Sequence, residues 1–181
     1  MNMLQKIMFA ATLMLSGHAA VAEEAPLKLP PVMYYSTLED SLFDTLKSNP
    51  VFSQIDKELY GSPLRLGVIH TFAPTAGGTA TGLTSAVLAG GSLGILPIVS
   101  NNDLVVTYTL SAHGKVLATF NYSKNFTQAT NIYSNQGINR LDKPTTEWVN
   151  STVTLFIADL VKNPDVRKLT DEYNFYFGSI K

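Results

Sequence analysis

One short stretch of the chain matches the pattern that surrounds the nucleophile of a serine hydrolase. Residues 90–94 read Gly-Gly-Ser-Leu-Gly, a G-x-S-x-G sequence centred on Ser92. Asp103 and His113 follow in the chain order that an α/β-hydrolase triad requires. In such a triad the histidine takes the proton of the serine hydroxyl, which then attacks an ester or amide carbonyl. A small serine hydrolase using Ser92 is therefore one function to weigh.

The elements that must position these residues argue against that chemistry. The pattern needs a strand before the serine, a helix after it, and a larger α/β scaffold. His113, however, lies in Ala-His-Gly-Lys between two segments of alternating hydrophobicity, which predicts a hairpin tip. Glycine-rich apolar segments also produce this five-residue match by chance. We therefore predict no catalytic residues and expect the protein not to be an enzyme.

Other kinds of site find less support in the residue types. The chain has no Cys. His70 and His113 are expected on separate elements without a carboxylate at ligand spacing, so we predict no metal site. Gly77 and Gly78 lack the Gly-Lys-Ser/Thr ending of a phosphate-binding loop, and we predict no cofactor. With 13 Lys and Arg against 14 Asp and Glu, the formal net charge of -1 does not support nucleic-acid binding.

The first 22 residues have the three parts of an export signal. Lys6 supplies the positive charge, residues 7–15 form an apolar region too short to span a bilayer, and residues 20–22 read Ala-Val-Ala, a small-x-small cleavage site. No Cys follows the apolar region, so we expect no N-terminal acylation. Of the 181 residues, 45% are hydrophobic and 15% are charged, which fits one folded domain with an apolar surface. We expect a periplasmic protein.

Beyond this signal, the residue pattern predicts an α+β fold with one domain over residues 36–181. In it a small antiparallel sheet packs with two helices, and a Gly-rich apolar helical or hairpin insert interrupts the sheet. The expected elements are an extended leader over 23–35, a helix that starts with a capping box at Ser36 and Glu39, strands over 64–72, 104–110 and 116–122, a polar loop over 124–143, and a helix from Pro144 to Asn163. Residues 173–177 are interpreted either as a last strand or as an aromatic dock.

The apolar insert, residues 74–102, is the most unusual feature of the chain. No Asp, Glu, Lys or Arg occurs between Arg65 and Asp103. Three interpretations of residues 79–99 remain open. A transmembrane helix has the required length, but its glycines and Pro97 count against it, and it would place the flanking strands on opposite sides of the bilayer. An interfacial hairpin uses the same glycines to turn back. A helix covering the sheet would simply belong to the core.

We favour the interfacial hairpin, because it leaves the flanking strands paired. An exposed apolar patch of this kind usually marks contact with lipid or with a protein. The residues predicted to contact a membrane or a partner protein are Leu83, Val87, Leu88, Leu93, Ile95, Leu96 and Ile98.

The order of motifs resembles a family of small, largely uncharacterised Gram-negative envelope proteins, many of them outer-membrane lipoproteins. The resemblance covers about residues 34–162 and rests on the Ser-Leu-Gly-Ile-Leu-Pro stretch at 92–97 and on the strand-like stretches at 103–110 and 114–122. It implies a periplasm-facing α/β domain without enzyme activity at the outer envelope. Because this chain lacks the acylated Cys of many such proteins, the apolar insert becomes the expected membrane or partner contact.

Together these observations predict a non-enzymatic exported envelope protein that associates with a membrane surface or an envelope protein through residues 79–99. The location we expect is the periplasm, in association with the outer membrane. The alternative is a soluble periplasmic protein-binding or immunity-type module that recognises its partner through the polar residues 124–143 and the aromatic tail.

Overall fold

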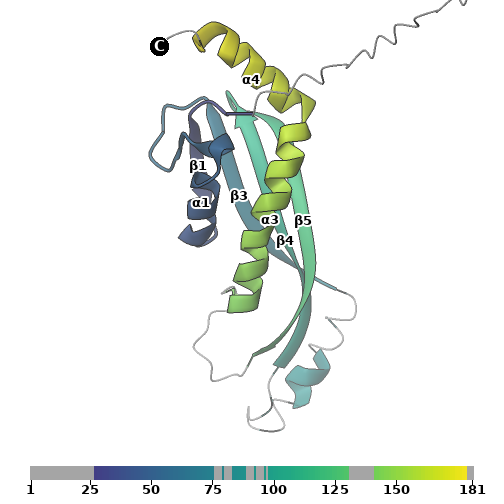
Figure 1. Ribbon diagram of the computed structural model, residues 1–181. Coiled ribbons are helices and arrows are strands. Elements are labelled where there is room, and N and C mark those ends of the chain that lie inside the picture. Colours follow the sequence, from purple (N-terminus) through teal and green to yellow (C-terminus); the bar gives the residue numbers. More distant parts are fainter. Residues whose placement is uncertain are drawn as a thin grey trace, which may run out of the picture.

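A mixed sheet forms the body of the protein (Figure 1). The computed structural model describes residues 27–75, 79, 83–88, 92, 96, 98–130 and 141–178. Within these residues the sheet has five strands in the order β2-β1-β3-β4-β5. Their bounds are β1 (Val32–Ser36), β2 (Ile55–Asp56), β3 (Leu64–Pro74), β4 (Ile98–Ala112) and β5 (Lys115–Thr130).

The α+β class is confirmed, with one difference in the sheet. β3, β4 and β5 are antiparallel to one another, as expected, but β1 runs parallel to both β2 and β3. β1 lies at the end of the segment that was expected to be an extended leader. Its apolar side chains, Val32 and Tyr34, are buried and join the core.

The helices are α1 (Asp40–Lys47), a 3-10 turn η1 (Pro50–Phe52), α3 (Lys143–Lys162) and α4 (Pro164–Phe177). The predicted limits of α3 are confirmed: Asp142 accepts a hydrogen bond from the Thr145 amide at 3.0 Å, and Pro144 lies in the first turn. Asn163 ends α3, and its side chain also caps α4 by accepting from the Asp165 and Val166 amides.

One local prediction is wrong, and one of two open interpretations is excluded. The capping box does not form, since Ser36 belongs to β1 and α1 begins at Asp40, after Glu39, which makes no side-chain cap. Ser36 instead accepts a hydrogen bond from the Leu38 amide at 2.9 Å. Residues 173–177 are not a strand, because they continue α4 to Phe177.

The core lies between one face of the sheet and the helices α1 and α3, which Figure 1 shows side by side over that face. Phe156 of α3 is its centre: its ring stacks on Tyr108 of β4 with centroids 4.2 Å apart and also contacts Phe120 at 5.4 Å and Phe52 at 5.8 Å. Such burial of aromatic and aliphatic surface is the main source of stability in a chain without disulfides. The aliphatic residues around this cluster include Leu42, Leu46, Ile55, Leu64, Leu66, Val68, Leu104, Val106, Leu110, Val149, Val153 and Leu160.

The hairpin between β4 and β5 has the predicted tip. His113 and Gly114 both have positive φ values, 50° and 77°, as a two-residue turn that follows the strand twist requires. The amide of His113 donates to the Pro63 carbonyl at 2.8 Å, which holds the tip against the start of β3. β5, however, continues to Thr130, so residues 124–130 are strand rather than the predicted polar loop.

Candidate functional site

The apolar insert connects two strands that are neighbours in the sheet. β3 ends at Pro74 and β4 begins at Ile98, and the last register pair of the two strands is Pro74 with Asn102. The Thr75 hydroxyl donates to the Asn101 carbonyl at 3.2 Å, so the chain leaves and re-enters the sheet at the same place. Residues 75–97 therefore form a connection whose two ends lie side by side.

A second contact shows that the insert folds back on itself. The Ser85 hydroxyl accepts a hydrogen bond from the Val99 amide at 2.9 Å and donates to the Val99 carbonyl at 3.0 Å. In one straight helix these residues, fourteen positions apart, would be separated by about 21 Å. The interpretation of residues 79–99 as one membrane-crossing helix is therefore wrong. In the described part of the chain, no helix is both long enough and apolar enough to span a bilayer.

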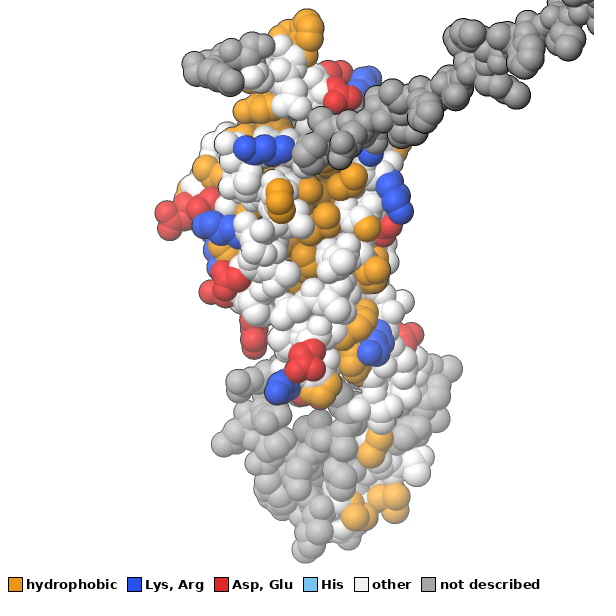
Figure 2. Space-filling view, viewed as in Figure 1, with side chains coloured by type: hydrophobic (Ala, Val, Ile, Leu, Met, Phe, Trp, Pro, Cys, Tyr) orange, Lys and Arg blue, Asp and Glu red, His pale blue; other side chains and the backbone are white. Residues whose placement is uncertain are grey.

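The described apolar side chains of the insert are exposed. Their exposed fractions are 67% for Leu83, 76% for Val87, 56% for Leu88 and 47% for Leu96. Residues 83–88 form a helical segment, and in Figure 2 hydrophobic side chains are visible at this end of the molecule. These four side chains therefore do not belong to the core that packs on the sheet, contrary to the interpretation of the insert as a buried helix.

The structure does not describe the side chains of the other three predicted contact residues. Leu93 and Ile95 lie outside the described residues, and Ile98 is the first residue of β4, where only its backbone is described. Leu83 and Val87 are four positions apart in the helical segment, so their side chains lie on the same side of it. Their role in binding stays a prediction.

The residues of the proposed triad are not brought together. Ser92 lies in the insert, where its hydroxyl accepts a hydrogen bond from the Leu96 amide at 3.0 Å. Asp103 lies in the part of β4 next to the insert, whereas His113 is at the hairpin tip beyond the far end of the strand. Ten residues of extended strand separate Asp103 from His113, a distance of about 33 Å. The structure therefore does not assemble a catalytic triad from Ser92, Asp103 and His113.

No group of three or more His, Cys, Asp or Glu residues that could hold a metal ion occurs among the described residues. His70, on β3, instead makes a local contact. Its Nδ1 lies 3.1 Å from the Thr37 hydroxyl oxygen, which also accepts a hydrogen bond from the His70 amide at 3.3 Å. Burial lowers the pKa of His70 below its ordinary value. These features describe a histidine that helps to join the segment after β1 to β3.

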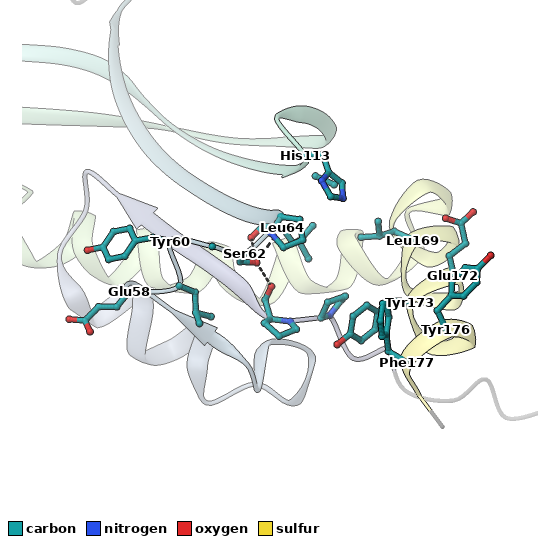
Figure 3. Close-up of a pocket in the computed structure, with 16 residues that line it drawn as sticks. Glu58, Tyr60, Ser62, Leu64, His113, Leu169, Glu172, Tyr173, Tyr176 and Phe177 are labelled. Atoms are coloured by element: carbon teal, nitrogen blue, oxygen red, sulfur yellow. Dashed lines mark hydrogen bonds between the residues drawn. The ribbon is translucent and has the colours of Figure 1, made fainter. Parts of the chain in front are cut away.

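A large pocket lies at the other end of the sheet, and no motif in the sequence indicates it. It has a volume of about 820 Å³ and is lined mainly by apolar side chains. Figure 3 shows that its walls come from separate stretches: the prolines before β1, the turn before β3, the hairpin tip and α4. The one sequence signal is the aromatic run at 173–177, for which a dock is one of the two interpretations, and nothing in the sequence indicates the distant residues that it faces. The lining residues include Pro30, Pro31, Tyr60, Leu64, Ala112, Leu169, Tyr173, Tyr176 and Phe177.

The turn that forms one wall of this pocket is fixed by Ser62. Its hydroxyl lies 2.6 Å from the Pro31 carbonyl oxygen, to which it donates, and accepts a hydrogen bond from the Leu64 amide at 3.2 Å. Ser62 thus ties the start of β3 to the proline segment before β1. The charged side chains along the pocket are two carboxylates, Glu58 and Glu172, and none of the described lining residues is Lys or Arg.

Comparisons with known proteins show no family for this chain. No family model matches it. No curated protein matches it either. One solved structure with a detectable likeness is the crystal structure of a minor lipoprotein from Acinetobacter baumannii, with 12% sequence identity and a TM-score of 0.37 over 79% of this chain and 96% of that chain. A likeness of this degree carries no inference about fold or function.

Proposed function

We propose that this protein is a non-enzymatic, exported envelope protein that binds a membrane surface through the end of its apolar insert. The observation that carries the proposal is the exposure of Leu83, Val87, Leu88 and Leu96, four large aliphatic side chains at one end of a domain whose core lies elsewhere. Burying such a side chain contributes about 1.5–3 kcal/mol. Four of them supply enough free energy for reversible attachment to a lipid surface.

The fold of the insert supports attachment through the exposed end of the insert, here called the insert tip, rather than through a segment that crosses the bilayer. Both ends of the insert are held at the same end of the neighbouring strands β3 and β4, by the Pro74–Asn102 pair and by the Thr75 hydroxyl. The absence of charged residues from 66 to 102 means that no ion would lose its hydration when the tip enters the headgroup region. An export signal at the N-terminus, as the sequence predicts, would place this tip in the periplasm, next to a membrane.

Flotation with phospholipid vesicles tests the proposal. The mature chain is mixed with phosphatidylcholine vesicles, and the double variant Leu83→Asp with Leu88→Asp is compared with Val116→Asp and Leu155→Asp. These two control residues are also exposed, at 63% and 53%, but lie on β5 and α3. We expect the insert variant to stay at the bottom of the gradient while both controls float with the vesicles.

The same variants in intact cells supply the second readout. After carbonate and high-salt washing, the unaltered protein and the two controls should remain in the membrane fraction, and the insert variant should not. If the insert variant floats and fractionates like the unaltered protein, the insert is not the membrane contact and the proposal fails.

One observation favours the alternative of a soluble protein-binding module. The end of α4 exposes three aromatic side chains, with exposed fractions of 79% for Phe175, 70% for Tyr176 and 54% for Phe177. Aromatic residues are enriched in the centres of protein interfaces. A partner captured from the periplasm by the unaltered chain and by the insert variant, but not by Phe175→Ala, would support this alternative.

A further inference from the structure

The pocket between α4 and the start of the sheet lies at the opposite end of the molecule from the insert. In Figure 1, α4 and the helical segment at residues 83–88 occupy the two ends of the long strands β3 and β4. A ligand in the pocket would therefore not compete with the proposed membrane contact. This separation makes the pocket a second, independent site.

The lining of the pocket is one continuous face of α4. Leu169, Glu172, Tyr173, Tyr176 and Phe177 follow the spacing of residues that share one side of a helix. Such a face normally covers a core, but here it borders open volume (Figure 3). The cavity thus takes the place of the packing partner that this face of the helix would otherwise have.

The base of α4 is well anchored, which keeps this face in position. Val166 and Thr170 have exposed fractions of 0% and 2%, and the Thr170 hydroxyl donates to the Val166 carbonyl at 2.9 Å. Further along the helix, the rings of Tyr173 and Phe177 contact each other with centroids 5.1 Å apart. These rings form an aromatic wall on a helix that is fixed at its beginning.

The charges at the pocket select among apolar ligands. Glu58 and Glu172 place two carboxylates at opposite ends of its border (Figure 3), and the described lining residues include no Lys or Arg, with His113 as the one imidazole among them. Aromatic rings of Tyr and Phe also attract organic cations through their negative faces. Both features favour a positively charged group and disfavour an anion such as a fatty-acid carboxylate.

We propose that this pocket binds a small amphiphilic cation, a molecule with an apolar body and a positively charged amine. The apolar body would lie against Leu64, Leu169 and the two prolines, and the amine would lie at the border near Glu172 and the rings of Tyr173 and Tyr176. The volume of about 820 Å³ falls within the range of about 300–1,000 Å³ that is typical of small-molecule sites.

Three probes with one alkyl chain and different headgroups test the proposal. Dodecylammonium, dodecanol and dodecanoate, each below its micelle concentration at pH 7.5, are titrated against the mature protein carrying the neutral apolar dye N-phenyl-1-naphthylamine. We expect dodecylammonium to displace the dye at about tenfold lower concentration than dodecanoate, because exposed carboxylates attract one headgroup and repel the other. Equal or tighter binding of dodecanoate or dodecanol, or no displacement by any probe, overturns the proposal.

Two matched pairs of variants place the binding in this pocket. Glu172→Gln should reduce the preference for dodecylammonium over dodecanol severalfold, whereas Asp171→Asn, the neighbouring carboxylate outside the pocket, should leave it unchanged. Tyr173→Ala should weaken all three probes, whereas Phe175→Ala, on the same helix but outside the pocket, should weaken none. Equal effects of both members of each pair would show that the probes bind elsewhere and would refute the assignment.

Discussion

The hydroxyl of Ser85 bridges both backbone groups of Val99, accepting from its amide at 2.9 Å and donating to its carbonyl at 3.0 Å. The Ser85 side chain thus pairs with the β4 backbone at Val99, beyond the last register pair of β3 and β4, Pro74 with Asn102. The pairing holds the helical segment 83–88 against the sheet while its aliphatic side chains point to solvent. The exposure of these side chains is therefore part of an ordered arrangement of the backbone.

Replacing Ser85 with Ala should release this attachment. The Val99 amide would lose its partner, and we expect the local opening free energy to fall by about 1–2 kcal/mol, since two hydrogen bonds are lost at a half-buried site. Hydrogen exchange followed by NMR should show the Val99 amide exchanging about tenfold faster. Ser123→Ala, on the exposed surface of β5, is the control and should leave this exchange rate unchanged. If Ser85→Ala also leaves the rate unchanged, the two hydrogen bonds of Ser85 do not stabilise this attachment.

The centre of the core can be tested with two neighbouring residues of α3. Phe156 is fully buried and contacts three other aromatic rings, whereas Leu155 next to it is 53% exposed. Phe156→Ala should lower the free energy of unfolding by about 3–5 kcal/mol through the cavity that it leaves. Leu155→Ala should change it by no more than about 0.5 kcal/mol. Urea unfolding followed by the fluorescence of Trp148 measures both, and similar losses would contradict this assignment of the core.

Two buried tyrosines should respond differently to loss of their hydroxyl groups. The Tyr34 hydroxyl makes no hydrogen bond of ordinary geometry among the described residues; burial raises its pKa to about 12, against a smaller lowering by the nearby Ser36 side chain. The Tyr108 hydroxyl lies 2.7 Å from that of Thr152, which in turn donates to the Val149 carbonyl. Tyr34→Phe removes only an unpaired polar group, so it should leave stability unchanged or raise it by up to about 1 kcal/mol.

Tyr108→Phe removes a formed hydrogen bond and should lower the free energy of unfolding by about 1 kcal/mol. The same urea titrations provide the measurement for both variants. Because each substitution keeps the ring in place, the difference between them reports on the hydroxyl alone. An equal loss in the two variants would show that Tyr34 has a partner after all.

The elements that periodicity predicted are those whose own residues determine them. β3 and the hairpin of β4 and β5 alternate clearly between core and surface, and His113-Gly114 marks the turn. The limits of α3 follow from Pro144 and from Asn163-Pro164, which act within a few residues. Local chemistry was sufficient for these elements.

The elements that were missed depend on partners that are distant in the sequence. β1 has only five residues and forms because β3 lies beside it, more than thirty positions later. The run at 173–177 is rich in aromatic residues that favour strands, but it continues a helix already started by the Asn163 cap. Residues 124–130 look like a loop because they are polar, yet they pair with the start of β4, and Phe126 packs on Trp148.

The two candidate sites show the same contrast. The contact residues of the insert could be named from the sequence, because they follow one another within a single charge-free segment. The pocket at α4 could not, because stretches from four parts of the chain meet only in the folded protein. A pocket of this kind leaves no motif, since each stretch on its own resembles an ordinary turn or helix end.

The last prediction concerns pH and His70. Burial lowers the pKa of this imidazole in the folded state below the value of 6.5 that it has when unfolded. As the pH falls below 6.5, the unfolded chain takes up the proton first, so the folded state loses stability until the pH passes the folded pKa. Above 6.5 both states are neutral at this position, and the contribution of His70 does not change.

We therefore expect the melting temperature to fall on acidification from pH 7 to pH 5.5, and His70→Gln to reduce this fall. The matched control is His113→Gln, which removes an imidazole at the exposed hairpin tip. The readout is thermal unfolding by circular dichroism in steps across this range, where most carboxylates remain ionised. If His70→Gln has the same pH slope as the unaltered protein, burial of His70 beside Thr37 does not favour the neutral imidazole, and the prediction is wrong.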